Sequence, residues 1–254
     1  MANNISRQEI MVGVAAREIK DNEVSFIGTG LPMIAAYLAK FTHAKNSNLL
    51  FESGIIDSKP QDLATGVGDF TLLSDCTKTS GLYYALSLLQ RGKIDLGFLG
   101  GAEVDKFGNI NSTVIGDYFN PKVRLPGSGG ANDIASLAKR TVIIVPHQKR
   151  KFPENINYIT TPGYLDGPGA REKAGLEGGG PKKVITDLAV LGFDDHTKRM
   201  RLESTHPGVS IEEVKEKTGF ELLIPDEVPN TELPTPEEVE LIRLIDQKNI
   251  YLKY

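Results

Sequence analysis

An acidic residue between two apolar runs is the first candidate for chemistry in this sequence. It is Glu52, in the stretch NLLFESGII (residues 48–56). Its apolar neighbours there are Leu49, Phe51, Ile55 and Ile56. Such neighbours would exclude water from a carboxylate, which could then act as a nucleophile or a general base. The alternative is structural: the carboxylate would accept hydrogen bonds from backbone amides at a turn, or pair with a lysine.

A glycine-rich stretch, LPGSGGAND (residues 125–133), is the second candidate. Its glycines allow positive φ and a close approach of the backbone, and it leads into an expected helix. Amides at a helix N-terminus can hold an anion, either a phosphate or a transient oxyanion. The stretch matches neither the dinucleotide fingerprint nor a P-loop, so a tight connection is the alternative. Gly28-Thr29-Gly30 is weaker and is expected to be a packing turn.

A long segment, residues 97–127, contains further carboxylates and no helical periodicity. Long loops of this kind are often functional. Its candidate acids are Glu103, Asp105 and Asp117, and capping of turns is the simpler expectation for each.

No metal site is expected from the histidines. His43, His147, His196 and His206 have none of the spacings that metal ligands show, so each is expected at the surface or satisfied by hydrogen bonds. The single cysteine, Cys76, has no neighbour that would activate it, and we expect an inert thiol.

The composition excludes several classes of protein. With 254 residues and 40% hydrophobic content, the chain can bury a large core. The net charge is −4 and no basic patch contains interleaved aromatic residues, so no nucleic acid partner is expected. No apolar run approaches the roughly 20 residues needed to cross a bilayer, and the N-terminus is not a secretory signal. One cysteine precludes an internal disulfide, and we expect a soluble cytoplasmic protein.

Strands alternating with helices must position these candidates. The periodicity predicts helices at 6–20, from Pro32 to about Phe41, at 80–91 and at 132–140, and strands at 24–28, 48–52, 94–100 and 141–146. Because the strands are apolar on both faces, the fold class is α/β, an open mostly parallel sheet with helices on both faces. A strand ending at Glu52 places the acid at the carboxyl edge of the sheet, where such folds bind ligands.

The C-terminal part of the chain has a different pattern. Residues 161–181 are rich in Gly and Pro and predict a long loop. VITDLAVLGF and RMRLES flank DDHTK and predict a β-hairpin. Ser210 and Thr235 are the expected N-caps of two helices. We predict one domain over residues 1–254, with a peripheral C-terminal portion from about residue 183.

Three motifs in order, Glu52 within ESG, GGAEVDKFGNINST and PGSGGAND, resemble the β subunit of family I CoA-transferases. The similarity runs from the first helix through HPGVSIEEV near residue 214. Within the family, VDKFGNINSTVIGDYFNPKVRLPG is similar to the β subunit of 3-oxoadipate CoA-transferase, and TPGYLDGPGAREKAGL to that of glutaconate CoA-transferase. The acid substrate therefore stays open. The resemblance implies a fold related to sugar-phosphate isomerases.

The resemblance also implies a mechanism and partners. Glu52 would attack an acyl-CoA, forming an acyl-glutamyl anhydride and then a glutamyl-CoA thioester, with ping-pong kinetics. A backbone amide of Gly129, Gly130 or Ala131 would help to form an oxyanion hole, and Ser128 and Asn132 would contact CoA or substrate. Coenzyme A would be a substrate, and no cofactor is expected. A separate α subunit would complete the active site, giving a hetero-oligomer.

Two alternatives remain open. Glu52 could act as a general base in a hydrolase or carbon–carbon lyase acting on an acyl-CoA. A non-catalytic module of the same broad fold would instead bind a sugar phosphate without using Glu52. For a distal carboxylate of the substrate, Arg124 and Arg171 are possible contacts, although a solvated surface role is the simpler expectation.

Overall fold

The computed structural model describes residues 5–60 and 62–253, and these residues form two compact units. The first contains the chain up to Phe98 together with the residues from Glu232 onward, and the second is Leu99–Thr231. A single domain with a peripheral portion from residue 183 stays a prediction.

The first unit alternates helices and strands, as expected for the α/β class. Its elements are α1 (Arg7–Arg17), β1 (Val24–Ile27), α2 (Leu31–Phe41), β2 (Asn48–Phe51), β3 (Ile55–Ile56), a 3-10 turn (Phe70–Leu73), β4 (Lys78–Thr79), α3 (Leu82–Gln90), β5 (Leu96–Leu99) and α7 (Pro236–Ile245). Strand β1 pairs in parallel with β2 and with β5. Strands β3 and β4 extend this sheet in antiparallel fashion beyond β2.

Local sequence signals set the beginnings of these helices. The Ser6 hydroxyl accepts from the Glu9 amide, and the Glu9 carboxylate accepts from the Ser6 amide, so these two residues form a capping box at the start of α1. Thr235 and Glu238 form the same box at the start of α7. Helix α1 ends at Arg17, a few residues earlier than predicted, because Glu18 is already its C-cap.

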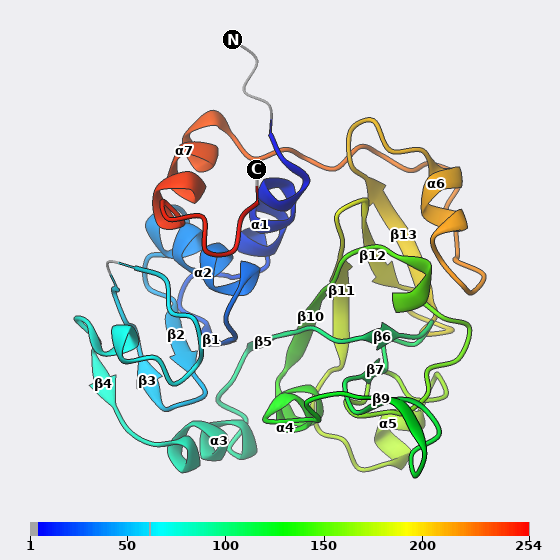
Figure 1. The fold of residues 1–254 in the computed structure, drawn as a ribbon, viewed down its shortest axis with the longest axis horizontal. Coiled ribbons are helices and arrows are strands. Elements are labelled where there is room, and N and C mark those ends of the chain that lie inside the picture. Colours follow the sequence, from blue (N-terminus) through cyan, green and yellow to red (C-terminus); the bar gives the residue numbers. More distant parts are fainter. Residues whose placement is uncertain (1–4, 61, 254) are drawn as a thin grey trace. The chain divides into compact units, whose positions relative to one another are not determined.

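The C-terminal helix α7 returns to the first unit and packs against α1 and α2, as Figure 1 shows. The ion pair between Arg243 of α7 and Glu9 of α1 joins the two helices, with 2.6 Å between Nε and Oε1. The residues from Met33 to Ala39 of α2 are all buried, so this helix is covered on every side. The core of the first unit therefore includes both ends of the described chain.

The second unit contains four successively paired strands, β10 to β13, and short hairpins. Its elements are β6 (Glu103–Val104), β7 (Ile110–Asn111), β8 (Val114–Gly116), β9 (Pro121–Arg124), α4 (Ala131–Leu137), β10 (Arg140–Ile144), a 3-10 turn (Lys149–Lys151), α5 (Ala170–Lys173), β11 (Pro181–Ile185), β12 (Ala189–Phe193), β13 (Met200–Thr205) and α6 (Ile211–Glu216). Strands β10 and β11 are parallel, and β12 and β13 continue antiparallel from β11.

The predicted hairpin around DDHTK is confirmed as the pair β12 and β13. Its first arm is shorter than predicted, because VITDLAVLGF is divided between β11 and β12. The Thr186 hydroxyl accepts from the amides of Leu188 and Ala189, and this bonding closes a turn between the two strands. The sequence alone did not reveal this turn, because it contains neither Gly nor Pro.

The predicted helix from Asn132 to Arg140 is wrong at its end. Helix α4 stops at Leu137, and Arg140 already belongs to β10. Ala138 is extended, with ψ at 144°. Amides from a distant loop take the carbonyls that a longer helix would use, since Gly178 donates to Ser136 and Gly179 to Lys139.

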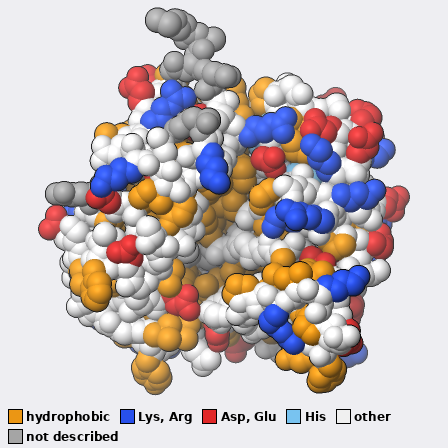
Figure 2. Space-filling view, in the orientation of Figure 1, with side chains coloured by type: hydrophobic (Ala, Val, Ile, Leu, Met, Phe, Trp, Pro, Cys, Tyr) orange, Lys and Arg blue, Asp and Glu red, His pale blue; other side chains and the backbone are white. Residues whose placement is uncertain are grey.

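Two segments expected to be irregular contain short regular elements. Residues 97–127 hold the pairs β6–β7 and β8–β9, and residues 161–181 hold α5. Among the described residues, no helix is long and apolar enough to span a membrane. Acidic and basic side chains are interspersed on the face that Figure 2 shows.

Candidate active site

Glu52 directly follows the buried strand β2, as the sequence predicted. The parallel register pairs Ile27 of β1 with Phe51 of β2, so Glu52 is one residue beyond the last pair. It therefore lies at the carboxyl end of two parallel strands. Crevices at this end are where open α/β sheets bind ligands.

The turn that carries Glu52 is fixed by close backbone packing. Gly54 donates to the Phe51 carbonyl at 2.9 Å and has a positive φ of 89°. A Cβ at Gly54 would lie 2.6 Å from the carbonyl oxygen of Gly81. The Ser80 amide and hydroxyl both donate to the Gly54 carbonyl, at 3.0 and 2.7 Å. Only glycine fits this position, and the ESG turn is therefore locked against the segment before α3.

The Glu52 side chain is partly exposed, whereas most of its apolar neighbours are buried. Leu49 and Phe51 have no exposed surface, because they face the core of the first unit. The exclusion of water from Glu52 therefore stays a prediction, and this chain by itself leaves the residue partly exposed. A Cβ at Gly28, which follows β1, would meet no atom within 4 Å, so the space above β1 is open.

The glycine-rich stretch belongs to the second unit and forms a tight turn before α4. Gly127 and Gly129 have positive φ values of 94° and 50°, which explains why glycine stands at both positions. Gly127 exchanges two hydrogen bonds with Ser112: its amide donates to the Ser112 carbonyl at 2.8 Å, and its carbonyl accepts from the Ser112 hydroxyl at 2.9 Å. Gly129 is exposed, and its amide donates to no described residue.

Ser128 and Asn132, the two polar candidates of this turn, hold the turn together. The Ser128 carbonyl accepts from the Ala131 amide at 3.0 Å, and its hydroxyl accepts from the Asn132 amide at 3.1 Å. The side chain of Asn132 donates from Nδ2 to the Thr160 carbonyl at 2.9 Å. Gly130 is buried directly before α4.

Two of the three carboxylates in residues 97–127 cap turns, as expected. Asp105 accepts from the amides of Phe107 and Asn109, and Asp117 accepts from those of Phe119 and Asn120. Burial raises the pKa of Asp105, although hydrogen bonds from its turn oppose this effect.

Glu103 has a different role, which the sequence did not indicate. This carboxylate is 5% exposed and accepts from Nδ2 of Asn111 and from both the amide and Nδ2 of Asn157. It therefore joins β6 to β7 and to a loop more than fifty residues away.

Arg171 differs most from its sequence-based prediction. It was expected at the surface, yet it is 4% exposed and donates to the carbonyls of Ala135, Pro162, Gly163 and Gly178. Burial lowers the pKa of its guanidinium. The side chain supports loops and is not placed to bind a substrate carboxylate. Arg124 is exposed, as expected, and its guanidinium lies 4.9 Å from the centre of the Tyr118 ring.

The four histidines either make hydrogen bonds within the protein or lie at its surface. His147 and His206 are buried and bonded to threonines, His43 contacts the Ile19 carbonyl, and His196 lies in the exposed turn between β12 and β13. No group of three His, Cys, Asp or Glu side chains among the described residues could hold a metal ion. Cys76 is a free, partly exposed thiol.

A glutamate on a glycine-locked turn, at the carboxyl end of parallel strands, defines an α/β protein with a candidate site at that edge. The model of one family, Coenzyme A transferase, matches residues 9–217. The chain belongs to this family.

Known members of the family are similar over nearly the whole chain. The β subunit of glutaconate CoA-transferase from Acidaminococcus fermentans is 41% identical, covering 94% of this chain and 92% of its own. The β subunit of 3-oxoadipate CoA-transferase from Pseudomonas knackmussii is 42% identical, covering 96% and 94%. The crystal structure of glutaconate coenzyme A-transferase from Acidaminococcus fermentans matches with a TM-score of 0.93 at 38% identity, covering 99% of this chain and 98% of that one. The resemblance seen in the sequence and the fold class are confirmed.

Proposed function

We propose that this chain is the β subunit of a heteromeric CoA-transferase that moves coenzyme A between an acyl-CoA and a dicarboxylic acid. Its similarity to the β subunits of the enzymes named for glutaconate and for 3-oxoadipate supports this assignment. The observation that carries the proposal is the position of Glu52, partly exposed at the carboxyl end of β2 on a rigid turn.

The first half of the reaction loads coenzyme A onto Glu52. The carboxylate attacks the thioester carbonyl of the acyl-CoA, forms an acyl-glutamyl anhydride and releases the CoA thiolate. The thiolate then attacks the glutamyl carbonyl of the anhydride, which gives a glutamyl-CoA thioester and releases the first acid as its carboxylate. Each intermediate contains an activated acyl group, first in the anhydride and then in the glutamyl thioester, as in other covalent mechanisms with ping-pong kinetics.

The second half runs these steps in reverse with another acid. The carboxylate of the incoming acid attacks the glutamyl thioester, forming a new anhydride and releasing the CoA thiolate. Attack of this thiolate on the acyl carbonyl then gives the new acyl-CoA and restores Glu52. Coenzyme A is a substrate in both halves, and the scheme needs no cofactor or metal.

Each attack passes through a tetrahedral oxyanion that needs hydrogen-bond donors. The turn Gly129-Gly130-Ala131 is the proposed source of one donor. Its best candidate is the Gly129 amide, because Gly129 is exposed and its amide donates to no described residue. One donor of this kind typically changes the rate by about 10²–10³-fold. Ser128 and Asn132 directly precede and follow the Gly129-Gly130-Ala131 turn. We propose that they contact CoA or substrate, and they also stabilise the turn by bonding to each other.

A substitution at Glu52 tests the proposal. In the complex with its α subunit, Glu52→Gln should lower acyl exchange by at least about 10³-fold, because the amide cannot form the anhydride. The control is Glu216→Gln on α6, an exposed glutamate that should leave exchange unchanged. Undiminished exchange by the Glu52→Gln complex would contradict the mechanism.

A trapping experiment separates transfer from the alternative in which Glu52 is a general base. The complex is incubated with acyl-CoA and then treated with borohydride or hydroxylamine. Transfer predicts loss of activity and a mass change on the peptide that contains Glu52. Hydrolysis or carbon–carbon cleavage of the acyl-CoA, without any modified peptide, would favour the alternative.

A further inference from the structure

Thr160 is a buried residue that joins three segments of the second unit. It is 6% exposed, and its amide donates to the Ile110 carbonyl at 2.9 Å. Its hydroxyl accepts from the Ser112 amide at 2.9 Å and lies 2.7 Å from the Thr113 hydroxyl. Its carbonyl accepts from Nδ2 of Asn132 at 2.9 Å.

These contacts reach both ends of the glycine-rich turn. At its start, Ser112 exchanges two hydrogen bonds with Gly127. At its end, Asn132 is the second residue of α4 and bonds to Thr160 and to Ser128. The turn between Gly127 and Asn132 is therefore linked to Thr160 at both ends: through Ser112 at its start and through Asn132 at its end.

A buried carboxylate, that of Glu103, holds the two segments that meet at Thr160. Glu103 accepts from Asn111, which directly precedes Ser112, and from Asn157, which is three residues before Thr160. The side chain of Asn111 also accepts from the Thr113 and Val114 amides at 3.0 and 3.3 Å. Residues 111–113 and 157–160, which meet at the Thr160 hydroxyl, are thus held together by a second set of hydrogen bonds through Glu103.

We propose that Thr160 is a positioning residue, which holds the Gly129 amide in a fixed orientation as an oxyanion donor. This inference rests on the proposed function, because it assumes that Gly129 supplies the donor. Preorganised donors stabilise a transition state only if their supports prevent reorientation. The turn contains two residues with positive φ, and Gly129 within it is exposed, so its geometry depends on hydrogen bonds to neighbouring segments.

The chemistry of the hydroxyl defines the test. Thr160→Val keeps the shape of the side chain but leaves the Ser112 amide without its acceptor. Thr160→Ser keeps the acceptor. The matched control is Thr231→Val, since Thr231 is also 6% exposed and its hydroxyl also makes two side-chain contacts, to Ser204 and His206. Those contacts lie at β13 and do not reach the turn.

Kinetics of the assembled enzyme are the first readout. Thr160→Val should lower kcat about tenfold or more, while KM for the acyl-CoA changes less than about twofold, because oxyanion contacts form in the transition state. Thr160→Ser should restore kcat, and Thr231→Val should retain it even if its Tm falls as far as that of Thr160→Val. A normal kcat in Thr160→Val, or equal losses in Thr160→Val and Thr231→Val, would overturn the proposal.

Hydrogen exchange is a second readout that needs no activity. Amides in residues 126–134 should exchange faster in Thr160→Val than in Thr160→Ser or Thr231→Val. If the wild-type complex shows no acyl exchange, the proposed function fails, and this comparison still decides whether Thr160 positions the turn. Equal exchange in all the variants would overturn the positioning role.

Discussion

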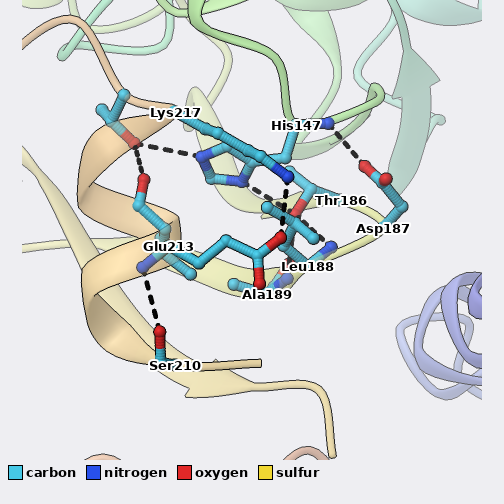
Figure 3. Close-up of polar contacts among 10 residues, drawn as sticks. His147, Thr186, Asp187, Leu188, Ala189, Ser210, Glu213 and Lys217 are labelled. Atoms are coloured by element: carbon cyan, nitrogen blue, oxygen red, sulfur yellow. Dashed lines mark hydrogen bonds and ion pairs between the residues drawn. The ribbon is translucent and has the colours of Figure 1, made fainter. Parts of the chain in front are cut away.

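His147 is a buried base whose two ring nitrogens both meet threonine hydroxyls. Nδ1 lies 3.0 Å from the Thr186 hydroxyl, and Nε2 lies 3.0 Å from the Thr218 hydroxyl. Figure 3 shows His147 and Thr186. The ring is 2% exposed and stacks on Phe152. Burial lowers the pKa of His147 to about 4, because the charged imidazolium would lose its hydration.

The charges around His147 modify this effect. Asp187 and Glu213 favour the protonated ring and so raise its pKa, whereas Lys217 and His206 oppose protonation. Asp187 also accepts from the His147 amide at 2.6 Å, and Lys217 is paired with Glu213 at 2.7 Å, as Figure 3 shows. Burial outweighs the two carboxylates, and His147 is neutral at pH 7.

We predict that His147 destabilises the protein in mild acid. Its pKa is about 4 when folded and near 6.5 when unfolded, so the unfolded state binds more protons between these values. The contribution of the neutral His147 ring to the free energy of unfolding is fully present above pH 6.5 and is lost as the pH falls towards 4. The loss by pH 4.5 is about 2–3 kcal/mol from this residue.

Urea unfolding at pH 7 and pH 4.5 measures this loss. His147→Gln removes the titrating ring, so the difference in unfolding free energy between the two pH values should be smaller in the variant. Carboxylates that do not interact with His147 contribute equally to both proteins and cancel in the comparison. Equal pH dependence in wild type and variant would contradict the prediction.

At the scale of elements, the turn between β2 and β3 depends on one glycine. A Cβ at Gly54 would meet three backbone atoms of Gly81 within 2.8 Å, and φ at this position is 89°. We predict that Gly54→Ala lowers the unfolding free energy by about 2 kcal/mol or more, since both strain and a backbone clash are introduced. Urea unfolding of the purified chain is the measurement.

Gly28 is the matched control, because it also follows a parallel strand of the first unit. A Cβ there has no neighbour within 4 Å. Gly28→Ala should therefore change the unfolding free energy by less than about 1 kcal/mol. A loss in Gly54→Ala no larger than in Gly28→Ala would show that the β2–β3 turn adapts to a side chain.

At the scale of the whole molecule, the exposure of Glu52 calls for a second polypeptide. The proposed anhydride hydrolyses readily, so water must be excluded from it, yet this chain leaves Glu52 partly exposed. We predict that the chain alone shows no acyl exchange, and that exchange appears when it is co-expressed and co-purified with an α subunit. Size-exclusion chromatography with light scattering should then give a mass larger than 27.7 kDa. Exchange by the isolated chain at the rate of the complex would contradict this prediction.

The sequence by itself determined the features that depend on neighbours along the chain. The N-caps at Ser210 and Thr235, the turn-capping role of Asp105 and the position of Glu52 at a strand end were all predicted. Each results from contacts between residues a few positions apart, which a pattern of side-chain types records. The strand periodicity also indicated the α/β class for the same reason.

Only the tertiary structure decided the features that join distant segments. Arg171 is buried because carbonyls from α4 and from two loop segments converge on its guanidinium, and α4 ends early because residues 178–179 donate to the carbonyls of residues 136 and 139. The link from Thr160 to the glycine-rich turn likewise joins residues 28 positions apart. Local patterns cannot report such contacts, because a polar side chain looks the same in sequence whether solvent or a distant backbone satisfies it.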